Sequence, residues 1–140
     1  MKTTRLLLTS LLMLSATLAH AKTLAKTTET LPSGVEVSVL EGAGGTEFAK
    51  ATDRVRVHYR GTLVNGTEFD SSYKSGQPIT FGLNQVIPCW TQGMQKVPVG
   101  ATAILKCPAN TAYGDGGVPG VIPPKSVLTF EVKLLEIVKK

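Results

Sequence analysis

Aromatic residues, histidine and cysteine are scarce in this chain of 140 residues. Only 6% of the residues are Phe, Trp or Tyr, and there are one tryptophan, two histidines and two cysteines. No Cys/His spacing in the sequence matches a metal site, and we expect no cofactor. The sequence also has no internal repeat and no low-complexity segment. Together with the length, these features predict one small domain.

Positive charge is not concentrated in any part of the sequence. The formal net charge is +5, and loss of Lys2 and Arg5 would leave +3 (5 minus 2). In the middle of the chain, Arg54, Arg56 and Arg60 alternate with apolar residues, as solvated strand positions do. A nucleic-acid-binding protein is expected to cluster its basic residues on one face. We therefore expect no nucleic acid among the partners.

Residues 1–21 have the features of a secretory signal peptide. A basic start is followed by an apolar stretch over 6–18 and by the small-residue sequence Ala19-His20-Ala21. The alternative is an amphipathic or membrane-spanning helix, but the apolar stretch is too short to span well and its small-residue end fits cleavage. We predict cleavage after Ala21, no membrane association afterwards, and a periplasmic or secreted protein. Residues 22–30 are polar and unpatterned and are predicted to be a flexible lead-in.

The remaining residues, 31–140, have the pattern of an α+β domain. Alternation of apolar and polar residues predicts strands, for example at 35–39, 55–60, 101–107 and 128–134. By this alternation His58 faces away from Val57 and Tyr59, so we expect an exposed histidine without a catalytic role. Asn65-Gly66 predicts a hairpin. Near Pro88 the period changes to that of one short helix. The sum is about five antiparallel strands and one helix.

Several separated motifs carry a resemblance to a known family. The stretches VHYRGTLVNGTEFDSS, VIPCW, AYGDGG, GVIPP and LTFEVKLLEI resemble the FKBP-type peptidyl-prolyl cis–trans isomerases, in consistent order from about Val55 to Ile137. The export signal further resembles exported bacterial members with a single domain. The resemblance implies a twisted antiparallel sheet wrapped around the short helix, with an aromatic pocket that binds proline.

The resemblance also implies roles for ten residues. It implies that Trp90 is the floor of the pocket and that Asp70 lies at its rim. The Ile87 N–H and the Tyr113 hydroxyl would hold the bound peptide by hydrogen bonds. Carried over position by position, the catalytic group is Tyr59, Asp70 and Tyr113, and the substrate-binding group is Phe69, Phe81, Val86, Ile87, Trp90, Ile122 and Phe130.

Two questions stay open at this point. Asp70 could take part in the reaction, for example by tuning the Tyr59 hydroxyl, or it could be an ordinary turn residue that bonds nearby backbone N–H groups. The family fold brings Cys89 and Cys107 near each other, so in an exported protein they could form a disulfide. The alternative is two buried thiols that act as small apolar residues.

The expected activity is isomerisation of X–Pro bonds in proline-containing polypeptides, namely exported proteins as they fold. Macrolide inhibitors are a further ligand class that the resemblance implies. Two other functions compete with the enzyme: a binding module that holds proline without turning it over, and a chaperone that works through an added surface. Because the expected pocket residues are all present and no inserted flap is seen, we predict a monomeric isomerase with weak chaperone activity at most.

Overall fold

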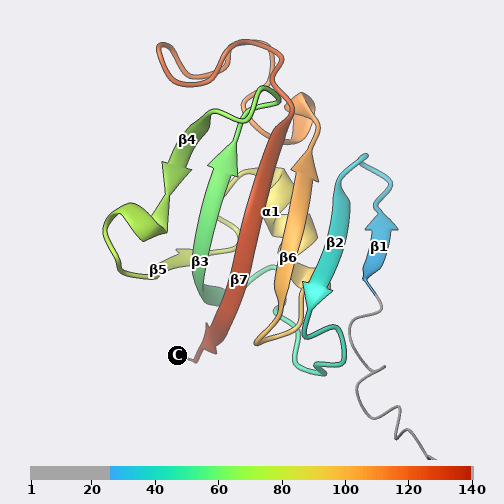
Figure 1. Cartoon of the computed structure of the whole chain (residues 1–140). Coiled ribbons are helices and arrows are strands. Elements are labelled where there is room, and N and C mark those ends of the chain that lie inside the picture. The colour runs from blue at the N-terminus through green and yellow to red at the C-terminus, as the bar shows by residue number, and fades with distance from the viewer. Residues whose placement is uncertain (1–25, 140) are drawn as a thin grey trace, which may run out of the picture.

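In the computed structural model, which describes residues 26–139, seven strands form one antiparallel sheet (Figure 1). The predicted signal peptide and residues 22–25 lie outside the described residues. The strands are β1 Thr27–Thr30, β2 Glu36–Glu41, β3 Arg54–Thr62, β4 Glu68–Ser71, β5 Ile79–Gly82, β6 Thr102–Cys107 and β7 Leu128–Val138. The helices are α1 Pro88–Gly93 and three 3-10 turns, η2 Ser72–Lys74, η3 Met94–Lys96 and η4 Ala109–Thr111.

The strands follow the order β1-β2-β6-β7-β3-β4, and β5 pairs with β3. The sheet twists around α1, which lies behind β6 and β7 in Figure 1. The prediction of an antiparallel sheet around one short helix is therefore confirmed. The expected number of about five strands is too low.

One strand that the sequence pattern did not predict is β1, which pairs with β2 from Thr27 opposite Val39 to Thr30 opposite Glu36. It lies within the segment that we expected to be a flexible lead-in, so that expectation is wrong for these four residues. All four are exposed. An edge strand with no buried face needs no apolar alternation, and this is why the sequence pattern did not predict it.

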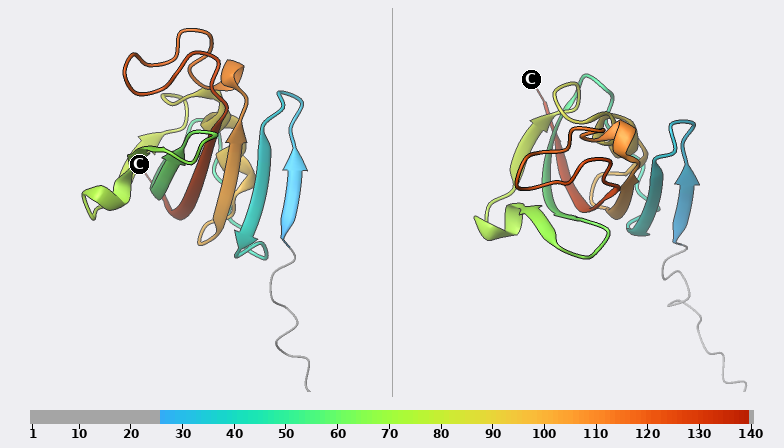
Figure 2. Two further views of the ribbon diagram at one scale, coloured as in Figure 1. Left: turned by 45° about the horizontal axis from the view of Figure 1, so that its top comes forward. Right: turned by 90° about the horizontal axis from the view of Figure 1, so that it is seen from above.

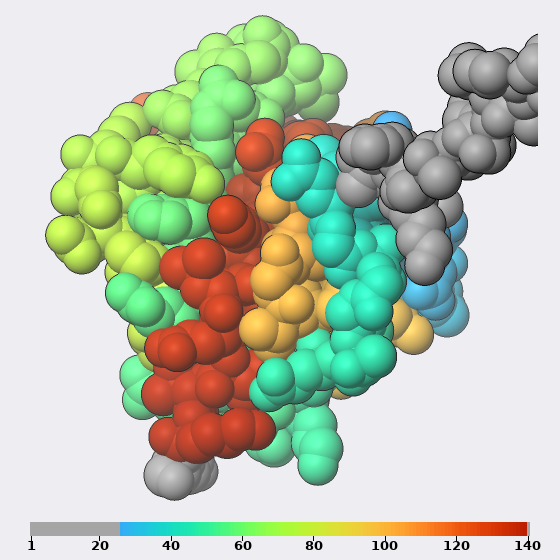
Figure 3. Space-filling view, turned by 60° about the horizontal axis from the view of Figure 1, so that its bottom comes forward, coloured from blue at the N-terminus to red at the C-terminus, as the bar shows by residue number. Residues whose placement is uncertain are grey.

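The core lies between the concave face of the sheet and α1. On β7, Leu128, Phe130, Val132 and Leu134 are buried, as the alternation predicted. The facing positions of β2, β3 and β6 are buried as well, and α1 and η3 add Trp90 and Met94. On the opposite side, β2, β6 and β7 lie side by side on an exposed surface (Figure 3). The structure contains no helix within 26–139 whose length and apolar content would let it cross a membrane.

One edge of β3 is shared by two short strands. The Asn65-Gly66 turn joins β3 to β4, with the Gly66 N–H bonded to the Leu63 carbonyl at 2.9 Å and Gly66 at a φ of 86°. The chain then leaves the sheet through η2 and returns as β5. At the end of the sheet where the turn between β3 and β4 lies, the long loop between β6 and β7 extends over the strand ends (Figure 2). These loops and strand ends enclose the site described next.

Candidate active site

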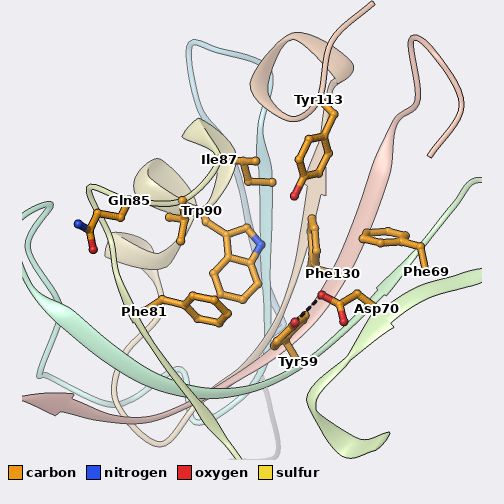
Figure 4. A pocket seen from close by; sticks show the side chains of 10 residues that line it. Tyr59, Phe69, Asp70, Phe81, Gln85, Ile87, Trp90, Tyr113 and Phe130 are labelled. Atoms are coloured by element: carbon orange, nitrogen blue, oxygen red, sulfur yellow. Dashed lines mark hydrogen bonds between the residues drawn. The ribbon is translucent and has the colours of Figure 1, made fainter. Parts of the chain in front are cut away.

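A cavity of about 370 Å³ opens between α1, the β3–β4 edge and the loop after β6. Its size falls within the range of small-molecule and peptide side-chain pockets. Five of the lining side chains are aromatic in addition to Tyr113, and Asp70 is the one carboxylate among them (Figure 4). The lining residues are Tyr59, Phe69, Asp70, Phe81, Gln85, Val86, Ile87, Trp90, Tyr113 and Phe130.

Trp90 forms the floor of this cavity. Pro88 occupies the first turn of α1, where its missing N–H costs nothing, and the Thr91 hydroxyl anchors the helix by donating to the Leu83 carbonyl at 2.5 Å. The indole is 4% exposed. It makes edge-to-face contacts with Tyr59, Phe81 and Phe130, with ring centroids 5.3, 5.4 and 5.4 Å apart. This geometry is favoured between aromatic rings, so three contacts fix the orientation of the indole.

A hydrogen-bonded pair lies at one side of the cavity. The Tyr59 hydroxyl donates to Asp70 Oδ2 at 2.5 Å, and the Ser71 N–H donates to Asp70 Oδ1 at 2.9 Å. Burial, followed by the hydrogen bond and the negative charge of Asp70, raises the pKa of Tyr59 well above its ordinary value. The hydroxyl therefore stays protonated at neutral pH and remains a donor.

Both alternatives for Asp70 thus describe contacts that exist in the structure. Its carboxylate does bond a nearby backbone N–H, as a turn residue would. It also accepts a hydrogen bond from the Tyr59 hydroxyl, as a residue that tunes this hydroxyl would.

Two further polar groups belong to residues that line the cavity, namely the Ile87 N–H and the Tyr113 hydroxyl. Ile87 precedes α1, and its carbonyl accepts the N–H groups of Trp90 and Thr91. Its own N–H has no acceptor among the described residues. The Tyr113 hydroxyl points into the cavity from the loop after β6 (Figure 4), and the Tyr113 side chain is partly exposed. Both groups are placed to bond a ligand that fills the cavity.

Phe69 and Phe130 close the remaining wall with an edge-to-face contact of 5.5 Å. They meet over Gly61, which β-pairing places opposite Asp70 on β4 and Phe130 on β7. A Cβ atom at Gly61 would lie 2.5 Å from Phe69 Cζ and 2.9 Å from Phe130 Cε1. The absence of a side chain at residue 61 therefore lets both rings close the wall.

Cys89 and Cys107 form a disulfide, with Cα atoms 5.6 Å apart and both residues fully buried. This settles the choice that the sequence left open. The bond ties the residue before Trp90 to the end of β6, from which η4 and Tyr113 follow. The floor of the cavity and one of its walls are thereby linked covalently.

Nine of the ten residues expected at the site line the cavity. The exception is Ile122, which is buried in the core and bonds Val118 across the loop after β6. It supports the segment that carries Tyr113 without lining the cavity itself.

Gln85 lines the cavity and was not predicted. No residue-type signal distinguishes it, although it directly precedes Val86 and Ile87. His58 is half-buried and stacks on Tyr73, with ring centroids 4.5 Å apart, outside the cavity. Within residues 26–139, no group of three or more His, Cys, Asp or Glu residues is arranged to hold a metal ion.

Comparison with known proteins agrees with the motifs and the geometry. The sequence model described as "FKBP-type peptidyl-prolyl cis-trans isomerase" matches residues 45–135. The chain is 51% identical over 107 residues to the FKBP-type peptidyl-prolyl cis-trans isomerase FkpA of Aeromonas hydrophila, covering 76% of this chain and 39% of FkpA. It is 45% identical over 108 residues to FK506-binding protein 1 of Debaryomyces hansenii, covering 76% of this chain and 96% of that protein.

A solved structure has the same fold. The crystal structure of a peptidyl-prolyl cis-trans isomerase from Pseudomonas syringae pv. tomato superimposes with a TM-score of 0.73 and 35% sequence identity, covering 80% of this chain and 81% of that one. The chain spans about two fifths of the length of FkpA, so only one part of that protein is matched. The family model alone covers well over half of the present chain. The protein belongs to the FKBP-type peptidyl-prolyl cis-trans isomerase family.

Proposed function

We propose that this protein catalyses cis–trans isomerisation of X–Pro peptide bonds. The observation that carries the proposal is a buried aromatic floor with hydrogen-bonding groups on two sides and no Ser, Thr, Cys, Lys or His among the lining residues. A proline ring is apolar and lacks a backbone N–H, so it can fill an aromatic cavity without leaving a donor unsatisfied.

The reaction needs no covalent chemistry. The barrier to rotation about a peptide bond is about 18–20 kcal/mol, because resonance gives the C–N bond partial double-bond character. X–Pro bonds populate both isomers and exchange in roughly tens to hundreds of seconds without a catalyst. A catalyst needs only to stabilise the twisted amide more than the planar one.

An aromatic cavity meets this requirement through its effect on charge. The planar amide is more strongly charge-separated than the twisted one, and water stabilises that separation. Trp90, Phe81 and Phe130 replace water with apolar surface. Loss of solvation therefore raises the free energy of the planar state more than that of the twisted state.

The polar groups fix the conformation of the bound chain. The Ile87 N–H and the Tyr113 hydroxyl would each bond a peptide carbonyl and hold the chain in a bent, turn-like shape. We assign Tyr59 to contact with the substrate at the opposite wall. Asp70 orients the Tyr59 hydroxyl, and because no proton is transferred in the reaction, Asp70 is not a general acid.

We infer that the substrates are proline-containing segments of exported proteins. The predicted signal peptide at 1–21 supports export. The Cys89–Cys107 disulfide is consistent with it, since such bonds persist in oxidising compartments. A monomer in the periplasm, or outside the cell, is the form that we propose.

The test compares two aromatic substitutions. Trp90→Leu removes the floor of the cavity, whereas Tyr73→Leu removes an exposed aromatic side chain that does not line it. We expect the first to reduce kcat/KM on a short X–Pro peptide by about tenfold or more and the second to leave it unchanged. Peptide binding by the wild type without catalysis would instead identify a binding module.

A further inference from the structure

One edge of β3 is interrupted beside the candidate active site. Residues 54–57 of β3 pair with β5, and residues 60–62 pair with β4. Between these ladders the chain makes its excursion through η2, so His58 and Tyr59 have no strand partner on that edge. A buried backbone N–H or carbonyl without a partner would be costly.

The Ser72 side chain fills this interruption. Its Oγ accepts the Tyr59 N–H at 2.8 Å and lies 3.3 Å from the Tyr59 carbonyl, to which it can donate. It also lies 2.9 Å from His58 Nδ1. Arg60 pairs with Ser71, so residue 72 is where the next backbone partner of Tyr59 would be if β4 continued. The Ser72 hydroxyl thus replaces the backbone carbonyl and N–H that a continued β4 would have offered to Tyr59.

Ser72 is fully buried, with a relative exposure of 0%. It lies two residues after Asp70, whose carboxylate accepts the Tyr59 hydroxyl. One short segment therefore holds Tyr59 at both ends, its main chain through Ser72 and its hydroxyl through Asp70. Figure 4 shows the second of these contacts at the wall of the cavity.

We propose that Ser72 is a positioning residue for the active site. By holding the Tyr59 main chain, it orients the Tyr59 hydroxyl toward the Asp70 carboxylate. It does not touch the cavity itself. This inference rests on the proposed isomerase function for its effect on catalysis, but its structural part does not depend on activity.

Loss of the Ser72 hydroxyl has a definite physical consequence. Ser72→Ala leaves the buried Tyr59 N–H without its acceptor, and the strand must shift or admit water to satisfy it. A hydrogen bond weakens steeply as its geometry departs from linear, so a small shift of Tyr59 loosens its contact with Asp70. We expect kcat/KM to fall about fivefold, which is about 1 kcal/mol of transition-state stabilisation.

The matched control is Ser75→Ala. Ser75 lies in the same turn and donates to the Ser72 carbonyl at 3.0 Å, and within residues 26–139 its hydroxyl has no hydrogen bond to Tyr59. General loosening of the turn would affect both variants alike. The proposal predicts that only Ser72→Ala changes catalysis and the environment of the Tyr59 hydroxyl.

Two readouts test the proposal. The first is the NMR resonance of the hydroxyl proton in the Tyr59–Asp70 bond, which is expected to shift or to exchange faster in Ser72→Ala and to be unchanged in Ser75→Ala. It can be recorded even on a protein without catalytic activity. Ser72→Thr keeps the hydroxyl and is expected to retain the resonance. Ser72→Gly also lacks the hydroxyl, and it provides the test, with the same expected shift, if Ser72→Ala does not fold.

The second readout is a double-mutant cycle on kcat/KM. If Ser72 acts through the Tyr59 hydroxyl, Ser72→Ala should have little further effect in a Tyr59→Phe background. An equal effect in both backgrounds, or an unchanged hydroxyl resonance in Ser72→Ala, would overturn the proposal. If the wild type has no isomerase activity but the Tyr59 hydroxyl resonance still shifts in Ser72→Ala, the result counts against the proposed function and not against the positioning role of Ser72.

Discussion

The Cys89–Cys107 disulfide allows a quantitative prediction, because its two partners are 18 residues apart in sequence. A cross-link lowers the entropy of the unfolded chain by an amount that grows with the logarithm of the closed loop. For a loop of this length the chain-entropy relation gives about 3 kcal/mol at 25 °C. Since small domains have total stabilities of about 5–15 kcal/mol, the bond is a large part of the whole.

Urea unfolding measures this contribution. We compare the oxidised protein with protein fully reduced by a dithiol, with reduction verified by thiol titration. With an m-value of about 1.5 kcal/mol/M, the midpoint should fall by about 2 M urea. The reductant must act on the unfolded chain, because both cysteines are fully buried in the folded one.

The double variant Cys89→Ala/Cys107→Ala is the control for the chemistry of the reductant. It should unfold at a lower urea concentration than the oxidised wild type, and the dithiol should not change its midpoint. An oxidised wild type and a verified reduced wild type with the same midpoint would refute the reasoning, because the loop would then contribute nothing to the free energy of unfolding.

Three further predictions follow from single residues. The pKa of Tyr59 is raised in the folded protein, so the protonated hydroxyl stabilises the fold fully below about pH 10 and this contribution is lost as the pH rises further. The urea midpoint should therefore fall more steeply above this pH in the wild type than in Tyr59→Phe. Equal slopes in the two proteins would contradict this. Lys125 adopts a left-handed φ of 58°, so Lys125→Gly should raise the free energy of unfolding by about 0.5–1 kcal/mol in thermal or urea unfolding. Lys125→Ala, which removes the side chain beyond Cβ but keeps the Cβ atom that disfavours this φ, should not raise it. Gly61→Ala places a Cβ against Phe69 and Phe130, so it should lower the free energy of unfolding by about 1–3 kcal/mol and weaken peptide binding. A variant that is as stable and binds as tightly as the wild type would contradict the close packing of the two rings over Gly61.

Most of the residues that line the cavity were named in advance through the resemblance to the FKBP family, because the motifs that carry the resemblance are short and contain distinctive residues. Trp90 after Pro88, Asp70 after Phe69, and Tyr113 between alanine and glycine each have few equivalents elsewhere in an aromatic-poor chain. The strands of the core were predictable for a different reason. Their buried and exposed faces differ, and so β3 and β7 show clear alternation.

The features that escaped prediction lack such a pattern. β1 is exposed on both faces, so its four residues resemble a polar linker. Gln85 lines the cavity because of where the loop before α1 runs, which residue type does not reveal. The contact of Ser72 with Tyr59 depends on the departure of η2 from the sheet, and one serine in FDSS looks like any other turn residue.

The central claim, catalysis of X–Pro isomerisation, is tested most directly at equilibrium. We would measure cis–trans exchange of a short X–Pro peptide by NMR exchange spectroscopy, with residues 22–140 of the protein present in substoichiometric amounts and no coupling protease. The account predicts an exchange rate that rises in proportion to protein concentration, with unchanged populations of the two isomers. Binding of the peptide with an exchange rate equal to that of the free peptide would contradict it.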